Sequence, residues 1–243
     1  MTRLSDVFER IYVINLPARS DRRSEVDVQL QRAGVSLSDS AVTLFEAIRP
    51  ADAGPFPSIG ARGCFMSHLE VLRDADSKKC KNILILEDDA NFAKGISAQL
   101  ELLKGSLEEL NWMLYYGGAL NEFSGARASS KLWEVEKTSP LSGSHCIAVN
   151  REILPKIVRY LDAMLGRPAG SPEGGPMHID GAYSWFRKDN PIARTFISVP
   201  ALSFQRSSAT DIHDRKWIDK QPFIGELARG VRRMKNNFMG WYR

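Results

Sequence analysis

Asn82-Ile-Leu-Ile-Leu-Glu-Asp-Asp89 decides the fold, because it joins the most apolar short run of the chain to three consecutive acids. An apolar run of this length is typical of a central strand that is covered on both faces. Charged side chains are very costly to bury, so acids at the end of such a strand indicate a cationic partner there. Side chains alternate in an extended chain, so we expect Glu87 and Asp89 to point one way and Asp88 the other.

Strands and helices alternate outward from this segment. The sequence predicts strands over 10–16, 42–47, 82–86, 112–116, 146–149 and 194–199, with helices over 20–33, 65–75, 92–107, 152–165 and from 178 onward. Gly34 stands where a glycine commonly ends a helix. This alternation predicts an α/β fold with a Rossmann-like, mostly parallel sheet flanked by helices. Ligands of such sheets bind outside the carboxyl ends of the strands.

Composition narrows the class of protein without indicating its chemistry. The 243 residues are 43% hydrophobic and 26% charged, which is ordinary for a globular chain and unlike a disordered or membrane-embedded one. The first residues lack the apolar core of a secretory signal, and Cys64, Cys80 and Cys146 have no metal-ligand spacing among themselves. We therefore expect reduced thiols and a cytoplasmic location.

The end of the chain carries a basic segment with aromatic neighbours. Residues 221–243 contain Arg229, Arg232, Arg233, Lys235 and Arg243, interleaved with Phe238, Trp241 and Tyr242. Such a tail can lie on an anionic membrane surface, here the inner face of the cytoplasmic membrane. A solvated terminal helix is an equal alternative, and no nucleic-acid partner is expected because no binding module accompanies the charge.

The acids after the central strand are the candidate metal ligands. Oxygen-rich sites select hard cations, so Glu87, Asp88 and Asp89 predict a site for Mn²⁺ or Mg²⁺. The alternative is a solvated strand end in which Asp89 or Asn91 caps the next helix.

Two further segments could hold phosphate groups. Arg19 and Arg22 follow the first strand at a helix start, where guanidinium groups can grip a pyrophosphate; a charged surface turn is the alternative. The segment 60–68 carries Gly63, Ser67 and His68 before and within a helix, where glycine allows close backbone approach to a ligand. His68 could equally be an ordinary packed histidine, and neither a P-loop nor a dinucleotide fingerprint is present.

The later part of the chain offers residues for the other half of a site. Asp180 follows the Gly/Pro-rich loop at 166–177 and is either a general base or a helix cap. Trp185 beside it suits a sugar, although it could equally be core. The polar stretch 205–214, with Gln205, Asp211 and His213, could close over a nucleotide or be a surface loop.

Taken together, these segments resemble glycosyltransferase family 25, which includes lipooligosaccharide and collagen galactosyltransferases. Four segments in order carry the resemblance across roughly residues 10–213: Tyr12–Pro17 with Arg19, Asp21 and Arg22; Gly60–His68; Ile83–Ala90 with Phe92; and Gln205–Ile212. The acids read Glu-Asp-Asp where many enzymes of the same fold read Asp-x-Asp, which makes the metal requirement an open question.

The resemblance implies a GT-A-type fold and a UDP-sugar donor, usually UDP-galactose. It implies transfer of a hexose onto a glycolipid or oligosaccharide acceptor such as lipooligosaccharide or lipopolysaccharide. The family members that it suggests invert the configuration at the anomeric carbon. For such a transfer we assign Asp180 as the catalytic base, because it lies in the acceptor-side half of the chain. The nucleotide-sugar would be bound by Asn15, Arg19, Arg22, Gly63, Ser67, His68, Asp88, Gln205 and Asp211, and the metal by Glu87, Asp88, Asp89 and His213.

We expect one glycosyltransferase domain over residues 1–220, with a nucleotide-binding part at about 1–120 and an acceptor-side part at about 121–220, followed by the basic tail. Two rivals stay open. A metal-dependent nucleotidyltransferase would release pyrophosphate from a nucleoside triphosphate. A catalytically inactive homologue would bind a nucleotide-sugar or glycan without turnover.

Overall fold

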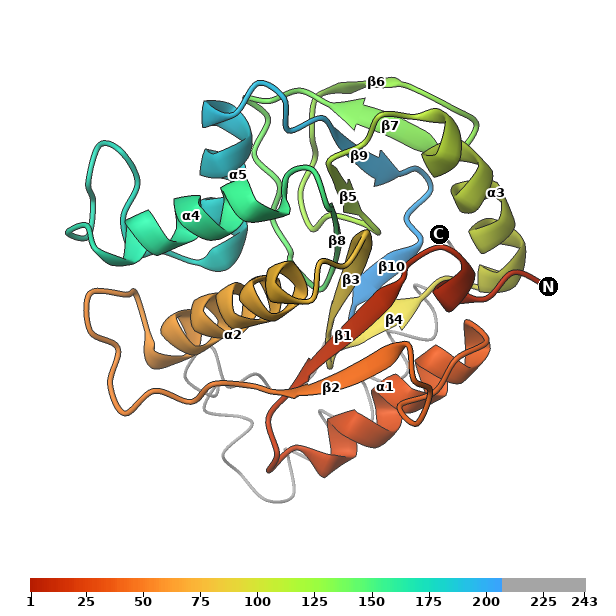
Figure 1. The fold of residues 1–243 in the computed structure, drawn as a ribbon, viewed down its shortest axis with the longest axis horizontal. Helices are drawn as coiled ribbons and strands as arrows, with labels where there is room; N and C mark the ends of the chain where they lie inside the picture. The colour runs from red at the N-terminus through yellow and green to blue at the C-terminus, as the bar shows by residue number, and fades with distance from the viewer. Residues whose placement is uncertain (207–243) are drawn as a thin grey trace.

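The central apolar segment forms strand β3 (Asn82–Glu87) near the middle of an eight-stranded sheet in the computed structural model, which describes residues 1–206 (Figure 1). The strand order is β2-β1-β3-β8-β5-β9-β7-β6. The other strands are β1 (Arg10–Asn15), β2 (Val42–Glu46), β5 (Leu114–Tyr116), β6 (Gly125–Arg127), β7 (Leu132–Val135), β8 (Cys146–Asn150) and β9 (Thr195–Ser198). A separate two-stranded sheet pairs β4 (Ala90–Phe92) with β10 (Ser203–Gln205).

The large sheet is mixed but has one dominant direction. β1 runs parallel to β2 and to β3, and β5 runs parallel to β9. β8 is antiparallel to its neighbours β3 and β5, and β7 is antiparallel to β9 and β6. Six of the eight strands therefore point the same way, and only β8 and β7 oppose them. The predicted α/β class, with a mostly parallel sheet flanked by helices, is confirmed.

Helices cover both faces of the sheet (Figure 1). On one face lie α2 (Ile59–Ser77), α4 (Leu154–Leu165) and α5 (Ile179–Asp189), and on the other lie α1 (Ser20–Arg32) and α3 (Ile96–Glu109). Alternation along β3 builds both cores, because Ile83 and Ile85 pack on the α2 side while Leu84 and Leu86 pack on the α1 side. The same alternation directs the next two side chains, Glu87 and Asp88, to opposite faces.

Local sequence signals explain most element ends. Gly34 follows α1 with a φ of 79°, a left-handed conformation that glycine adopts without strain, as the sequence predicted. Ser58 caps α2 through its side chain, which accepts a hydrogen bond from the Ala61 amide at 3.0 Å.

Two local expectations were wrong, and one hairpin was missed. Helix α2 begins at Ile59, so Gly60 and Gly63 lie inside its first turns and not before it. The chain after the acids forms β4, and α3 begins at Ile96 behind Gly95, so neither Asp89 nor Asn91 caps it. The hairpin of β6 and β7 was not predicted, because its short strands carry little apolar alternation.

Several predicted features lie outside the described residues. They are Asp211, His213 and the basic tail at 221–243. Among helices within residues 1–206, none combines the length and apolar character needed to cross a membrane.

Candidate functional site

The candidate site lies at the edge of the sheet where the parallel strands β1 and β3 end. Asn15 ends β1 and Glu87 ends β3. The neighbouring strand β8 is antiparallel to β3, and Cys146 at its start pairs with Leu86, so the preceding Ser144 and His145 reach the same edge. The topology thus brings residues from three distant parts of the sequence together.

Asp88 faces the α1 side and is fully engaged by polar partners. Arg22 Nη1 lies 2.9 Å from Asp88 Oδ1, and Asn15 Nδ2 donates to Asp88 Oδ2 at 2.8 Å. Only 9% of the Arg22 side chain and 10% of the Asp88 side chain are exposed, so this is a buried ion pair. Burial raises the pKa of Asp88 although the Arg22 charge acts against it.

Glu87 faces the α2 side and meets a different set of groups. Ser144 Oγ donates a hydrogen bond to Glu87 Oε1, and the Cys64 thiol lies 3.9 Å from the same oxygen. His68 Nε2 lies 3.4 Å from it. Burial acts to raise the pKa of Glu87, but the His68 imidazole, the Ser144 hydroxyl and the nearby His145 together outweigh burial and hold that pKa below its usual value.

Asp89 lies in the turn between β3 and β4 and is 7% exposed. Gln205 Nε2 donates to Asp89 Oδ2 at 3.0 Å, whereas Asp89 Oδ1 is buried without a hydrogen-bond partner within residues 1–206. Burial, followed by the nearby charge of Glu87, raises the pKa of Asp89 to about 7. The alternative of a solvated strand end is therefore wrong, because both Asp88 and Asp89 are buried.

Asp180 reaches the same region from the first turn of α5. Its Oδ2 accepts a hydrogen bond from the Gly143 amide at 3.3 Å, next to Ser144. The helix N-cap is His178, so Asp180 is not the cap residue. Burial raises the pKa of the Cys64 thiol well above its usual value, and Glu87, Asp180 and Asp89 raise it further through their charges. The charges of three candidate carboxylates therefore all raise the pKa of the Cys64 thiol.

The remaining predicted residues are engaged in structural contacts. Arg19 Nη2 pairs with Asp21 at 3.0 Å. The Ser67 hydroxyl donates to the Gly63 carbonyl at 2.7 Å and accepts from the Ile48 amide at 2.8 Å. A Cβ on Gly63 would lie 2.5 Å from the Ile48 carbonyl oxygen, so this glycine allows close approach of protein backbone rather than of a ligand.

The structure adds Cys64, Ser144, His145 and Tyr183 to the site. Cys64 and His68 stand four residues apart on α2, so they share one helix face, and this spacing was visible in the sequence. Ser144 and His145 carried no signal, because their position depends on β8 lying beside β3. Burial lowers the pKa of His145, while the nearby Glu87 opposes that change.

The donor atoms at this edge fit two kinds of cation. Asp89 offers one unpartnered buried oxygen, which suits a hard ion whose other ligands come from phosphate and water. Cys64, His68 and Glu87 form a second group, whose ligand atoms all lie within 4.8 Å of one another. Asp88 has both oxygens occupied by Arg22 and Asn15. The three acids therefore face three different surroundings.

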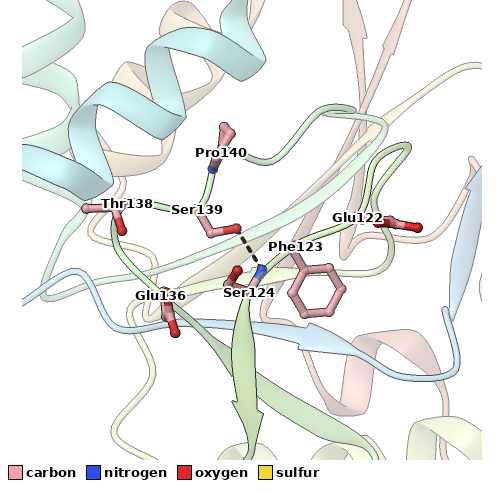
Figure 2. Close-up of a pocket in the computed structure, with 7 residues that line it drawn as sticks. All are labelled: Glu122, Phe123, Ser124, Glu136, Thr138, Ser139 and Pro140. Atoms are coloured by element: carbon pink, nitrogen blue, oxygen red, sulfur yellow. Dashed lines mark hydrogen bonds between the residues drawn. The ribbon is translucent and has the colours of Figure 1, made fainter.

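A separate pocket lies beside the β6–β7 hairpin (Figure 2). Its volume is about 410 Å³, and it is lined by Glu122, Phe123, Ser124, Glu136, Thr138, Ser139 and Pro140. The Ser139 hydroxyl accepts a hydrogen bond from the Ser124 amide at 2.8 Å, which joins its two sides. Its lining combines one phenyl ring with hydroxyl and carboxylate groups.

Comparison with protein families supports the resemblance seen in the sequence. The model of glycosyltransferase family 25, described as LPS biosynthesis protein, matches residues 53–142. This segment contains α2, β3 and the acids Glu87, Asp88 and Asp89. The resemblance to family 25 is therefore confirmed for the part of the chain that carries the central strand.

Some curated relatives are named galactosyltransferases and others are named inactive. Procollagen galactosyltransferase 2 of Mus musculus is 29% identical over 129 residues, covering 46% of this chain and 21% of the relative. A human protein named inactive glycosyltransferase 25 family member 3 is 28% identical over 129 residues, covering 46% of this chain and 22% of the relative. The match thus spans about a fifth of the length of these relatives.

Among solved structures, the crystal structure of A197 from STIV aligns with a TM-score of 0.41 and 13% identity. The alignment covers 84% of this chain and 98% of that chain. Similarity at this level does not establish a shared fold.

Proposed function

We propose that this chain is a glycosyltransferase of family 25 that moves a hexose, galactose in the first instance, from a UDP-sugar to a saccharide acceptor of lipooligosaccharide or lipopolysaccharide. The observation that carries the proposal is the set of buried acids at the end of β3. Asp88 and Asp89 are each 7% exposed, and they lie within the segment that matches the family. Burying these charges is costly, and we infer that they are buried because a functional site uses them.

The transfer needs a group that removes the acceptor proton. The acceptor oxygen attacks the anomeric carbon, the bond from that carbon to the UDP oxygen breaks, and UDP leaves with the bonding electrons. We assign the acceptor proton to Asp180, because this carboxylate lies on α5 beside the loop at Gly143 and shares the surroundings of Cys64 with Glu87 and Asp89. A positioned base of this kind contributes about 10²- to 10⁴-fold in rate.

The departing diphosphate needs positive charge. A divalent cation, Mn²⁺ or Mg²⁺, would supply electrostatic stabilisation of the leaving UDP. We propose Asp89 as its protein ligand, because Oδ1 is buried and unpartnered among the described residues. Asp88 would act by holding Arg22 and Asn15 in place.

We further propose that residues 1–220 form one glycosyltransferase domain. The part up to about residue 120 would bind the nucleotide, since it contributes Asn15, Arg22 and Asp89. The later part would bind the acceptor, since it contributes Asp180 and the pocket beside β6 and β7. We also propose that the enzyme is cytoplasmic and lies at the inner face of the cytoplasmic membrane.

The test is UDP release from UDP-galactose and from UDP-glucose, with and without Mn²⁺ and a lipooligosaccharide acceptor. We expect acceptor-dependent release with one donor. Asp180→Asn should lower kcat by about 10²- to 10⁴-fold, because the amide cannot take the proton. The exposed Glu109→Gln in α3 serves as the control and should turn over normally.

Two outcomes would contradict the proposal. Binding of UDP without turnover by any donor would favour an inactive homologue, a state that the name of the human relative makes a concrete alternative. Pyrophosphate release from a nucleoside triphosphate, without sugar transfer, would favour a nucleotidyltransferase.

A further inference from the structure

Cys64, His68 and Glu87 bring a sulfur, a nitrogen and an oxygen donor to one point between α2 and the end of β3. Glu87 Oε1 lies 3.4 Å from His68 Nε2 and 3.9 Å from Cys64 Sγ. A tetrahedral zinc ion with bonds of about 2.0–2.3 Å holds its donor atoms about 3.3–3.8 Å apart. Both distances from Glu87 are therefore already close to the spacing that such an ion imposes, and the ligand atoms of all three residues lie within 4.8 Å of one another.

The surroundings of His68 orient its Nε2 so that this atom can bind a metal ion. The side chain is fully buried, and Nε2 has no hydrogen-bond partner within the described part of the chain. The other ring nitrogen, Nδ1, lies 3.1 Å from the Tyr183 hydroxyl. When Nδ1–H donates to this hydroxyl, the lone pair remains on Nε2, which is the arrangement found in histidines that bind metals.

The other two donors are also held in place. Glu87 ends β3, and Ser144 Oγ donates to its Oε1, so the carboxylate is oriented from the opposite side. Cys64 and His68 lie one helical turn apart on α2, whose first turn is fixed by the Ser58 cap. The pair on a helix and the carboxylate on a strand end thus come from two rigid elements, which favours a defined coordination geometry.

We propose that Cys64, His68 and Glu87 form a binding site for a borderline divalent cation of the zinc type, separate from the hard-ion site at Asp89. Thiolate and imidazole donors select such ions over Mg²⁺. As the metal–sulfur bond forms, the Cys64 thiol releases its proton to solvent. The negative charges of Glu87, Asp180 and Asp89 near the thiol favour a dication there. This site requires no assumption about sugar transfer.

The test uses Co²⁺ alone, added to the full chain after removal of metals with a chelator. Tetrahedral Co²⁺ with a thiolate ligand gives strong visible bands and a sulfur-to-metal charge-transfer band in the near ultraviolet. We expect the charge-transfer band to saturate at one equivalent and to disappear when Zn²⁺ replaces Co²⁺. His68→Gln should weaken Co²⁺ binding at least tenfold, and Tyr183→Phe by about tenfold, as loss of an orienting partner does.

The chain contains three cysteines, which allows matched controls. Cys64→Ser should abolish the charge-transfer band, whereas Cys80→Ser and Asp89→Asn should keep it. Should Cys64→Ser fail to fold, the variant Cys80→Ser/Cys146→Ser, which retains Cys64 as its one cysteine, must still show the band. Absence of the band in the wild-type chain, or its survival in folded Cys64→Ser, would overturn the proposal. Neither result depends on transferase activity, so the two proposals fail separately.

Discussion

Asp89 is a residue whose proposed function lowers the stability of the fold. Its carboxylate is almost completely buried, it accepts a hydrogen bond from Gln205 on one oxygen, and its other oxygen has no partner within residues 1–206. A buried group of this kind costs stability when it is charged. A cation at Oδ1 would remove that cost, which is the physical link between the residue and the proposed reaction.

We predict that Asp89→Asn raises the free energy of unfolding at pH 8, without metal, by about 1–3 kcal/mol, because the neutral amide avoids the cost of burying a charge. The pKa of Asp89 in the folded protein is about 7, above the usual value of 3.8 for an aspartate. The folded protein therefore keeps a proton that the unfolded chain loses, so stability falls as the pH rises from about 4 to 7. The gain from Asn should be smaller at pH 5 than at pH 8.

Urea unfolding at both pH values, in the presence of a chelator, measures this difference. Glu109→Gln is the control, because Glu109 is exposed and should change stability little at either pH. An equal gain for Asp89→Asn at pH 5 and pH 8 would show that the carboxyl does not titrate in this range. The same variant should have lost UDP release.

At the scale of elements, the start of α2 is placed by close packing of backbone on backbone. A Cβ on Gly63 would lie 2.5 Å from the Ile48 carbonyl oxygen and 3.2 Å from Pro50 Cδ. By contrast, a Cβ on Gly105, an exposed residue in α3, would meet no atom within 4 Å. An added methyl group would therefore clash at Gly63 but not at Gly105, although both glycines lie inside helices.

We predict that Gly63→Ala lowers the free energy of unfolding by about 1–3 kcal/mol, because the added methyl group overpacks the contact with Ile48. The matched variant Gly105→Ala should raise it by about 0.5–1 kcal/mol, because alanine favours the helix and meets no obstacle. Urea midpoints of the two variants give the comparison. A stabilising Gly63→Ala would contradict the packing seen at the start of α2.

At the scale of the whole molecule, Arg187 joins one helical layer to the far half of the sheet. The residue lies in α5 and is 1% exposed. Its guanidinium donates to Thr195 Oγ1 at 3.1 Å, to the Ser139 carbonyl at 3.0 Å and to the Glu136 carbonyl at 2.8 Å. Ser139 and Glu136 also line the pocket, so one buried cation supports both the layer packing and the pocket wall.

We predict that Arg187→Met lowers the free energy of unfolding by more than about 3 kcal/mol, because each hydrogen bond from a charged donor contributes about 1.5–3 kcal/mol. The loss would also leave buried acceptors unsatisfied. The exposed Arg159→Met in α4 provides the control and should stay within about 0.5 kcal/mol. A loss for Arg187→Met no larger than for this control would mean that the three bonds do not hold the layers together.

The fold was predictable where local pattern is strong. The run at 82–86 gave β3, the helix signals from Ser20 to Gly34 gave α1, and the alternation gave the α/β class. The weak points were short strands such as β4, β6 and β10, whose formation depends on a partner elsewhere in the chain. Such strands have too few residues to show a period of two.

The sequence indicated which polar groups lie near the end of β3, and their roles remain predictions. The position of the acids at the end of β3 follows from the apolar strand that precedes them, whereas the place of Asp180 depends on how α5 packs on the sheet. Ser67 and Gly63 were expected at a ligand, yet they bind protein backbone at Ile48. A sequence pattern records which groups are present, but it does not record which neighbour satisfies them.

The sequence by itself determined the order of the longer strands and helices, and it also determined that Glu87 and Asp88 leave β3 on opposite faces. These properties are local, since backbone geometry and side-chain period fix them over a few residues. Tertiary structure alone decided that Glu87 meets His68 and Cys64, and that Asp88 meets Arg22. Those partners are 19 to 66 residues apart in the sequence, so only the packing of α1 and α2 on the sheet could select them.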